Sequence, residues 1–143
     1  MASHYPLSNL TVTELARSSD VEPHVVRYYT RIGLLSPSRD SHNGYKLFSR
    51  EDVGRLRFIR KAKLLGYTLN EIARIIDHAG HGESPCPIVR DIIERRIWEN
   101  RKKLDELLAL QNRMEQALDD WRRRPDKLPD GDMLCHLIES FID

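Results

Sequence analysis

Hydrophobic residues recur along this chain at intervals of three and four, the spacing that gathers side chains on one face of an α-helix. Val12, Leu15 and Ala16 predict one short helix, and "EPHVVRYYTRIG" predicts a second. Pro23 suits the first turn of that second helix, and Gly33 suits the position just after its end. The "SSD" sequence between the two helices interrupts the periodicity, so we expect a helix-turn-helix.

A different pattern follows, in which short extended segments flank Asn43-Gly44. Asn and Gly both tolerate the positive φ that a two-residue turn requires, so the sequence predicts a small β-hairpin. Two further helices are expected after it. Ser49 caps the first, which runs to Gly66, and Thr68 starts the second with Glu71 in a capping box. The side chains expected to face inward from the first are Val53, Leu56, Ile59 and Leu64.

A much longer helix is expected from about Pro87 to Trp121. Its seam residues alternate at spacings of four and three, which is the heptad pattern of a coiled coil. At about 1.5 Å per residue the helix is roughly 50 Å long. The preceding module is too small to cover such a seam, so a partner helix is expected. The seam contains Ile93, Ile97, Leu104, Leu107, Met114, Leu118 and Trp121, with Asn100 and Gln111 as polar positions expected to fix its register.

The charges are unevenly divided along the 143 residues. Residues 1–77 hold 12 Lys and Arg against 8 Asp and Glu, whereas residues 78–143 hold 11 against 14. Contact with a polyanion is therefore expected in the first half. No apolar run approaches the roughly 20 residues that span a bilayer, and "MASHYPLSNL" lacks the features of a signal peptide. We expect a cytoplasmic protein that does not contact the membrane.

The second helix of a helix-turn-helix enters the DNA major groove, which makes its polar side chains candidates for DNA contact. Arg27 is expected to reach a base edge or a phosphate. Tyr28 and Tyr29 are candidates for phosphate contacts, although one of them is expected to pack inward. Three residues near the hairpin tip, Arg39, Tyr45 and Lys46, are expected to contact the DNA backbone along an adjacent groove. Arg60 is a further candidate, with the alternative that it belongs to an ordinary solvated face.

Two segments, "VEPHVVRYYTRIGLL" and "NGYKLFSREDVGRLRFIRKAKLLGYTLNEIARII", resemble the winged helix-turn-helix of the MerR family of transcription regulators. The resemblance covers about half of the chain. It implies a mainly α fold and a homodimer joined by an antiparallel coiled coil. It also implies that the dimer binds double-stranded promoter DNA and distorts it for RNA polymerase when an effector binds. Lys46 stands where the family usually has arginine, and lysine cannot form a bidentate phosphate contact.

This resemblance suggests four parts. Residues 9–77 form the winged helix-turn-helix DNA-binding domain and residues 78–86 a linker. Residues 87–122 form the dimerisation helix, and residues 123–143 an effector-binding loop with a short helix in "MLCHLIESFI". The dimerisation contacts expected are Ile93, Ile97, Leu104, Leu107, Met114 and Leu118.

The chain has two cysteines, too few for a disulfide framework. Cys86 aligns with the cysteine that begins the dimerisation helix in the branch of the family that senses mercury, zinc, cadmium and lead. Cys135 aligns with the last cysteine of that branch's metal loop, whereas Trp121 lies nearest its middle cysteine. The resemblance thus implies that Cys86 of one subunit and Cys135 of the other hold a thiophilic ion, with His136 available as a supplement.

Candidate ions are Hg, Cu, Cd, Pb and Zn. Two thiolates suffice for linear Hg(II) or Cu(I), whereas Zn(II) prefers four ligands. His78, His81, Asp130 and Asp132 are other available donors.

Three alternatives stay open. Cys86 lies in the first turn of a helix, which favours a thiolate, so it could sense oxidants or electrophiles instead. Both cysteines could be inert packing residues, or the chain could be an architectural DNA-binding protein without an effector. An enzyme is not expected, because neither a Gly-rich phosphate loop nor an H-E-x-x-H motif is present. The residues after Trp121 are too few to enclose an organic ligand by themselves.

Overall fold

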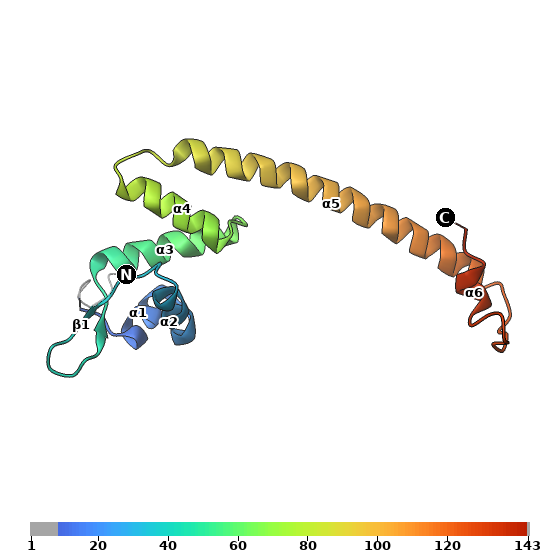
Figure 1. Ribbon diagram of the computed structural model, residues 1–143, viewed down its shortest axis with the longest axis horizontal. Helices are drawn as coiled ribbons and strands as arrows, with labels where there is room; N and C mark the ends of the chain where they lie inside the picture. The colour runs from blue at the N-terminus through green and yellow to red at the C-terminus, as the bar shows by residue number, and fades with distance from the viewer. Residues whose placement is uncertain (1–8, 143) are drawn as a thin grey trace. The chain divides into compact units, whose positions relative to one another are not determined.

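The computed structural model describes residues 9–142, which contain six helices and one two-stranded sheet (Figure 1). This composition confirms the mainly α fold. The chain divides into two compact units, one ending at Ile93 and the other beginning at Glu94. Residues 1–8 of the opening segment, which we interpreted as lacking a secretion signal, lie outside the described residues. None of the helices in residues 9–142 is long and apolar enough to cross a membrane.

Helices α1 (Val12–Ser19) and α2 (Pro23–Arg31) form the predicted helix-turn-helix. Thr11 caps α1: its hydroxyl accepts the Glu14 N–H at 3.2 Å, and Glu14 accepts the Thr11 N–H at 3.3 Å. Asp20 ends α1 in the left-handed region, with φ 55°. Pro23 stands at the start of α2, as predicted, because its missing N–H costs nothing there.

Strands β1 (Ser38–Arg39) and β2 (Lys46–Leu47) pair antiparallel, with Arg39 opposite Lys46. The hairpin is therefore confirmed, but its predicted two-residue turn is wrong, because residues 40–45 connect the strands. Among the described residues outside glycine, positive φ occurs at Asn9 and Asp20, so Asn43 does not adopt it. Side chains explain the longer loop. Asp40 Oδ1 accepts the His42 N–H at 2.7 Å, and Asn43 Oδ1 accepts the Tyr45 N–H at 2.9 Å.

Helices α3 (Arg50–Leu64) and α4 (Leu69–Gly80) follow in the first unit. Thr68 and Glu71 form the capping box predicted for α4, and Ser49 caps α3 as predicted, in a capping box completed by Asp52. The prediction that Leu64 faces inward is wrong, because 86% of its surface is exposed. Five residues after Ile59 correspond to about 140° of rotation, so Leu64 points away from the core. Ala62 occupies the last inward position instead. Helix α4 also runs three residues into the segment expected to be linker.

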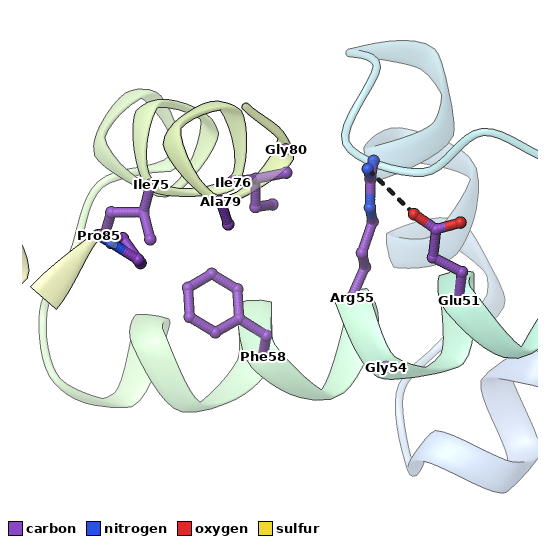
Figure 2. Close-up of a pocket in the computed structure, with 9 residues that line it drawn as sticks. All are labelled: Glu51, Gly54, Arg55, Phe58, Ile75, Ile76, Ala79, Gly80 and Pro85. Atoms are coloured by element: carbon purple, nitrogen blue, oxygen red, sulfur yellow. Dashed lines mark hydrogen bonds and ion pairs between the residues drawn. The ribbon is translucent and has the colours of Figure 1, made fainter. Parts of the chain in front are cut away.

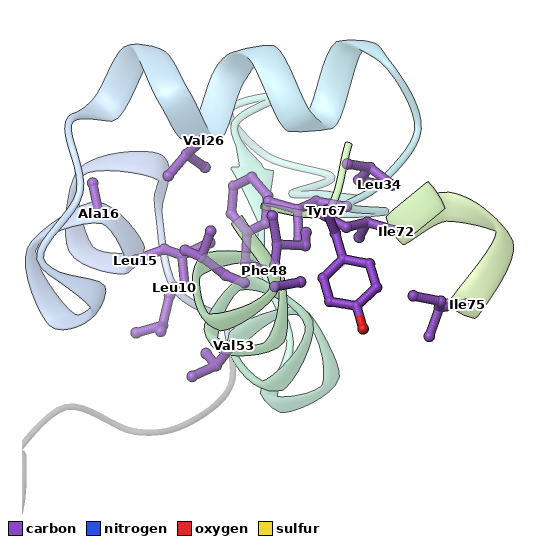
Figure 3. Close-up of a cluster of buried hydrophobic side chains, with 14 of the residues drawn as sticks. Leu10, Leu15, Ala16, Val26, Leu34, Phe48, Val53, Tyr67, Ile72 and Ile75 are labelled. Atoms are coloured by element: carbon purple, nitrogen blue, oxygen red, sulfur yellow. The ribbon is translucent and has the colours of Figure 1, made fainter. Parts of the chain in front are cut away.

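The core of this unit is a cluster of buried apolar side chains from α1 to the start of α5 (Figure 3). Phe48, which follows β2, is fully buried. Its N–H donates to the Leu10 carbonyl at 2.7 Å, and its carbonyl accepts the Leu10 N–H at 3.0 Å. The hairpin is thereby attached to the helices. The other buried side chains are Leu15, Ala16, Val26, Leu34, Leu35, Val53, Leu56, Ile59, Ala62, Tyr67, Ile72, Ile75 and Ile92.

Helix α5 (Cys86–Trp121) begins one residue before the predicted start and ends at the predicted residue. Its first two turns belong to the first unit, because Ile92 is buried in the core and the Tyr67 hydroxyl donates to the Val89 carbonyl at 2.7 Å. Helix α6 (His136–Glu139) is shorter than the amphipathic segment predicted for "MLCHLIESFI".

Candidate functional site

A hollow of about 500 Å³ lies between the N-terminus of α1, the side of α2 and the hairpin. Arg27 of α2 lines it together with Arg39, Tyr45 and Lys46 of the hairpin. Residues from two separate stretches of sequence therefore meet on one surface, as the DNA-contact prediction required. Three of these four side chains are cationic, so the hollow attracts an anion such as a phosphate.

The N-terminus of α1 adds donors that the sequence analysis missed. Thr11, Val12 and Thr13 line the same hollow. The N–H groups in the first turn of a helix have no intrahelical acceptors and carry a partial positive charge. The sequence signal that could have identified this end is the Thr11-x-x-Glu14 capping box, which marks where the helix starts.

The hairpin presents its cationic side chains at defined positions. Arg39 Nη1 donates to the Gly44 carbonyl at 3.2 Å, and Gly44 has φ 73°, a conformation that favours glycine. Tyr45, next along the chain, is 64% exposed. Its ring is therefore available to a partner that covers the hollow.

The two tyrosines of α2 differ in the way the sequence predicted. Tyr29 packs against the core, and burial, reinforced by the nearby Tyr28, raises the pKa of Tyr29. Tyr28 is exposed, and the guanidinium of Arg31 lies 5.4 Å from its ring centre. Tyr28 is therefore the tyrosine of α2 that remains available for a phosphate contact.

Arg60 lies elsewhere. Its Nη1 donates to the Ser19 carbonyl at 2.6 Å, at the C-terminal end of α1. It lines a separate hollow with Val21, Val25 and Tyr29. The structure thus does not bring Arg60 together with Arg27. The hydrogen bond to Ser19 indicates that the Arg60 side chain stabilises the end of α1.

An apolar hollow of about 360 Å³ lies between α3 and α4 in the first unit (Figure 2). Phe58 points into it from α3, and Ile75, Ile76 and Ala79 come from α4. An ion pair between Glu51 and Arg55, at 3.5 Å, lies at one end. None of the predicted DNA or metal residues lines this hollow.

The two cysteines are free thiols in different units of the chain. Cys86, the first residue of α5, is exposed, and its N–H donates to the Ser84 hydroxyl at 3.4 Å. Cys135 precedes α6 and is half-buried. The 36-residue helix between them is about 54 Å long. Within residues 9–142, no group of three His, Cys, Asp or Glu side chains is placed to hold a metal ion.

His136 directly follows Cys135, and its Nε2 lies 3.0 Å from the Pro125 carbonyl. The linker histidines have other partners. His78 Nε2 lies 3.7 Å from Glu83 Oε2, and His81 Nδ1 lies 3.6 Å from Asp77 Oδ1. Of the histidines considered as donors, His136 is the one beside a cysteine.

The predicted dimerisation seam is largely exposed in the single chain. Leu104 and Leu107 are 59% and 61% exposed. Ile97, Met114 and Leu118 are also exposed, whereas Ile93 packs partly against the core of the first unit. A hollow of about 390 Å³ is lined by α5, including the seam residues Met114 and Trp121, and by Ile138 and Phe141 of the C-terminal tail, residues 123–142. Apolar side chains of the tail and of α5 therefore share one surface.

Comparison with known proteins decides the family. Residues 10–79 match the family profile described as "MerR HTH family regulatory protein", and residues 53–117 match that described as "MerR, DNA binding". The chain is 32% identical over 131 residues to a mercuric resistance operon regulatory protein of Bacillus cereus, covering 92% of this chain and 96% of that protein. The chain belongs to the MerR family.

Two further transcription regulators align over most of their length. The regulator HmrR of Rhizobium leguminosarum bv. viciae is 29% identical, with 94% of this chain and 98% of that protein covered. Among solved structures, the transcription regulator PbrR691 from Ralstonia metallidurans CH34 in complex with lead(II) superposes with a TM-score of 0.71. It is 26% identical, and 92% of this chain and 98% of that chain are covered. These relatives are transcription regulators, so the expected class of protein is confirmed.

Proposed function

We propose that this chain is an effector-responsive transcription regulator that binds promoter DNA as a homodimer. The observation that carries the proposal is the hollow in which Arg27 meets Arg39, Tyr45 and Lys46 beside the N-terminus of α1. A DNA phosphate fits such a cluster of cations and backbone donors, and an adjacent recognition helix fits the major groove. The family profiles over residues 10–117 support the same partner.

A second copy of the chain is the proposed partner of α5. Exposed apolar side chains follow α5 at heptad spacing from Ile97 to Leu118, and such a stripe is stable in water when a second helix covers it. An antiparallel pair would place the end of one α5 beside the start of the other. The 78–86 linker of one subunit would then lie near residues 123–143 of its partner.

The proposed effector is a soft metal ion held by Cys86 of one subunit and Cys135 of the other. Thiolates are the ligands that soft ions prefer, and each cysteine by itself is an incomplete site. Two relatives support this class of effector: one is named for mercuric resistance and another was solved with lead(II). The family resemblance of both cysteines, described above, adds to that support.

The position of Cys86 links ion binding to the first unit, which ends at Ile93 and which we call the DNA-binding unit. Pro85 and Pro87 restrict the backbone on both sides of the thiol. Six residues later, Ile92 is buried in the core of the DNA-binding unit. An ion that favours one arrangement of the dimer would therefore shift the two DNA-binding units together. We propose that this shift distorts the promoter and allows RNA polymerase to act, within the cytoplasm.

Transcription and DNA binding, measured together, test this proposal. Cys86→Ser and Cys135→Ser are each expected to retain operator binding in a gel shift but to lose ion-dependent transcription. A double serine variant that still responds fully to a soft ion would contradict the assignment. Wild-type dimer that binds the promoter but responds to no ion or oxidant would instead indicate an architectural protein.

One observation favours a second candidate function, a sensor of oxidants or electrophiles. Cys86 is exposed at the beginning of a helix, where a thiolate is accessible to a small reagent. In that case Cys86→Ser abolishes the response to an oxidant, whereas Cys135→Ser leaves it intact. The single variants therefore distinguish the two candidates.

A further inference from the structure

The orientation of His136 identifies which of its ring nitrogens can bind a metal. Its Nε2 lies 3.0 Å from the backbone carbonyl oxygen of Pro125. A carbonyl oxygen can only accept a hydrogen bond, so Nε2 must carry the proton. In a neutral imidazole the other nitrogen, Nδ1, then has the free electron pair. Histidines that bind metals usually have this arrangement, in which the second ring nitrogen donates to a carbonyl or carboxylate.

Further hydrogen bonds hold the backbone on which His136 and Cys135 lie. The Cys135 N–H donates to Glu139 Oε2 at 2.8 Å. At the far end of α6, Arg124 Nη1 donates to the Ser140 hydroxyl at 2.6 Å. Arg124 also pairs with Asp120 of α5 at 3.2 Å. The thiol and the imidazole are thus carried by a segment that bonds to Arg124 and Pro125, just after the C-terminal end of α5.

We propose that His136 binds the effector ion through Nδ1, beside the thiolate of Cys135. This inference rests on the proposed function, which supplies Cys86 from the other subunit as the second thiolate. The ion would then have two sulfur ligands and one nitrogen ligand. The Pro125 carbonyl orients the imidazole without touching the ion.

The third ligand determines which ions bind well. A linear ion such as Hg(II) needs only the two thiolates, so His136 adds little to its affinity. Zn(II) and Co(II) favour four ligands and accept imidazole readily, so two thiolates, one imidazole and one water suit them. His136 therefore extends the range of the site from linear soft ions to borderline divalent ions.

Two substitutions of His136 separate the roles of its two nitrogens. In His136→Gln the side-chain amide can still donate to the Pro125 carbonyl, but the ligand at the Nδ1 position is lost. His136→Asn does the reverse, because its shorter side chain places an oxygen near the Nδ1 position and cannot reach Pro125. His42→Gln is the matched control, because His42 is exposed in the loop between β1 and β2 and is not among the candidate metal donors.

The full-length dimer is titrated anaerobically with Co(II), followed by its visible and near-ultraviolet absorption, and separately with Hg(II). We expect His136→Gln to weaken Co(II) binding by at least about tenfold, since even groups that only orient a ligand are worth 10- to 100-fold. Hg(II) affinity and the sulfur-to-cobalt charge-transfer band at saturating Co(II) should stay as in wild type. His42→Gln should match wild type in both titrations.

Co(II) binding by His136→Gln with wild-type affinity and spectrum would overturn the role of His136 while leaving the thiolate site intact. Loss of Hg(II) binding as well would also overturn it, because the substitution would then have disrupted the whole tail. Wild-type dimer that binds neither ion through its cysteines would instead contradict the proposed function itself. The failures of the two proposals are therefore distinguishable.

Discussion

The carboxylate of Asp52 accepts a hydrogen bond from the backbone N–H of Ser36 at 3.1 Å, across sixteen residues of sequence. Its other oxygen accepts the N–H and the hydroxyl of Ser49, at 3.0 and 3.2 Å. Asp52 is 3% exposed and is the one charged side chain buried among residues 9–142. It therefore attaches the segment leading into β1 to the N-terminus of α3, and so fixes the base of the hairpin that carries Arg39 and Lys46.

Asp52→Asn should destabilise the protein by about 1–3 kcal/mol, because an amide nitrogen would face a buried donor that has lost its acceptor. Urea unfolding measures this. Glu51→Gln is the matched control in the same helical turn. The exposed pair that Glu51 forms with Arg55 should contribute less than about 1 kcal/mol. Equal stability of the two variants would show that the Asp52 carboxylate does not stabilise the hairpin base.

Arg27 tests the proposed DNA surface. Arg27→Ala should weaken operator binding by about 1–3 kcal/mol if the side chain reaches a base, and should lower the salt dependence if it contacts a phosphate. Gel shifts at two salt concentrations separate these results. Lys102→Ala removes the same charge from an exposed position on α5, outside the hollow, and should bind like wild type. Unchanged affinity in both Arg27→Ala and Tyr45→Ala would remove this hollow from the DNA interface.

The exposed seam predicts an obligate dimer. Replacing Leu104 and Leu107 by glutamate would bury two charges at the centre of the proposed helix pair, so the variant should dissociate or unfold. Analytical ultracentrifugation at micromolar concentration measures the change. Leu128→Glu makes the same chemical change at a loop residue that is 89% exposed, and should leave the dimer intact. A wild-type monomer under these conditions would contradict the proposed architecture.

Tyr29 predicts how stability changes in alkali. Burial raises the pKa of Tyr29 above the ordinary value of 10.0, so at high pH the folded protein retains a proton that the unfolded chain releases. The stability associated with Tyr29 is therefore fully present below about pH 10 and is lost as pH rises through the folded-state pKa. Tyr29→Phe should make the loss of unfolding free energy between about pH 9 and pH 11 shallower. An unchanged slope in urea unfolding over that range would contradict this assignment.

The sequence by itself determined most helices and their ends. Local signals sufficed there, because a capping box or a proline in the first turn acts through neighbouring residues. Thr68 with Glu71, and Pro23 at the start of α2, are positions of this kind. Heptad spacing likewise predicted the extent of α5 to within one residue. The family resemblance also came from residues that lie close together in sequence.

Tertiary structure decided what depends on contacts between distant residues. One example is the attachment of the hairpin, where the backbone of Phe48 bonds to that of Leu10, far away in sequence. The tyrosine of α2 that packs inward, and the attachment of the hairpin base by Asp52, depended on how the elements meet. So did the contact between His136 and Pro125, eleven residues apart. Such contacts follow from the packing of whole elements, which short-range periodicity and capping do not specify.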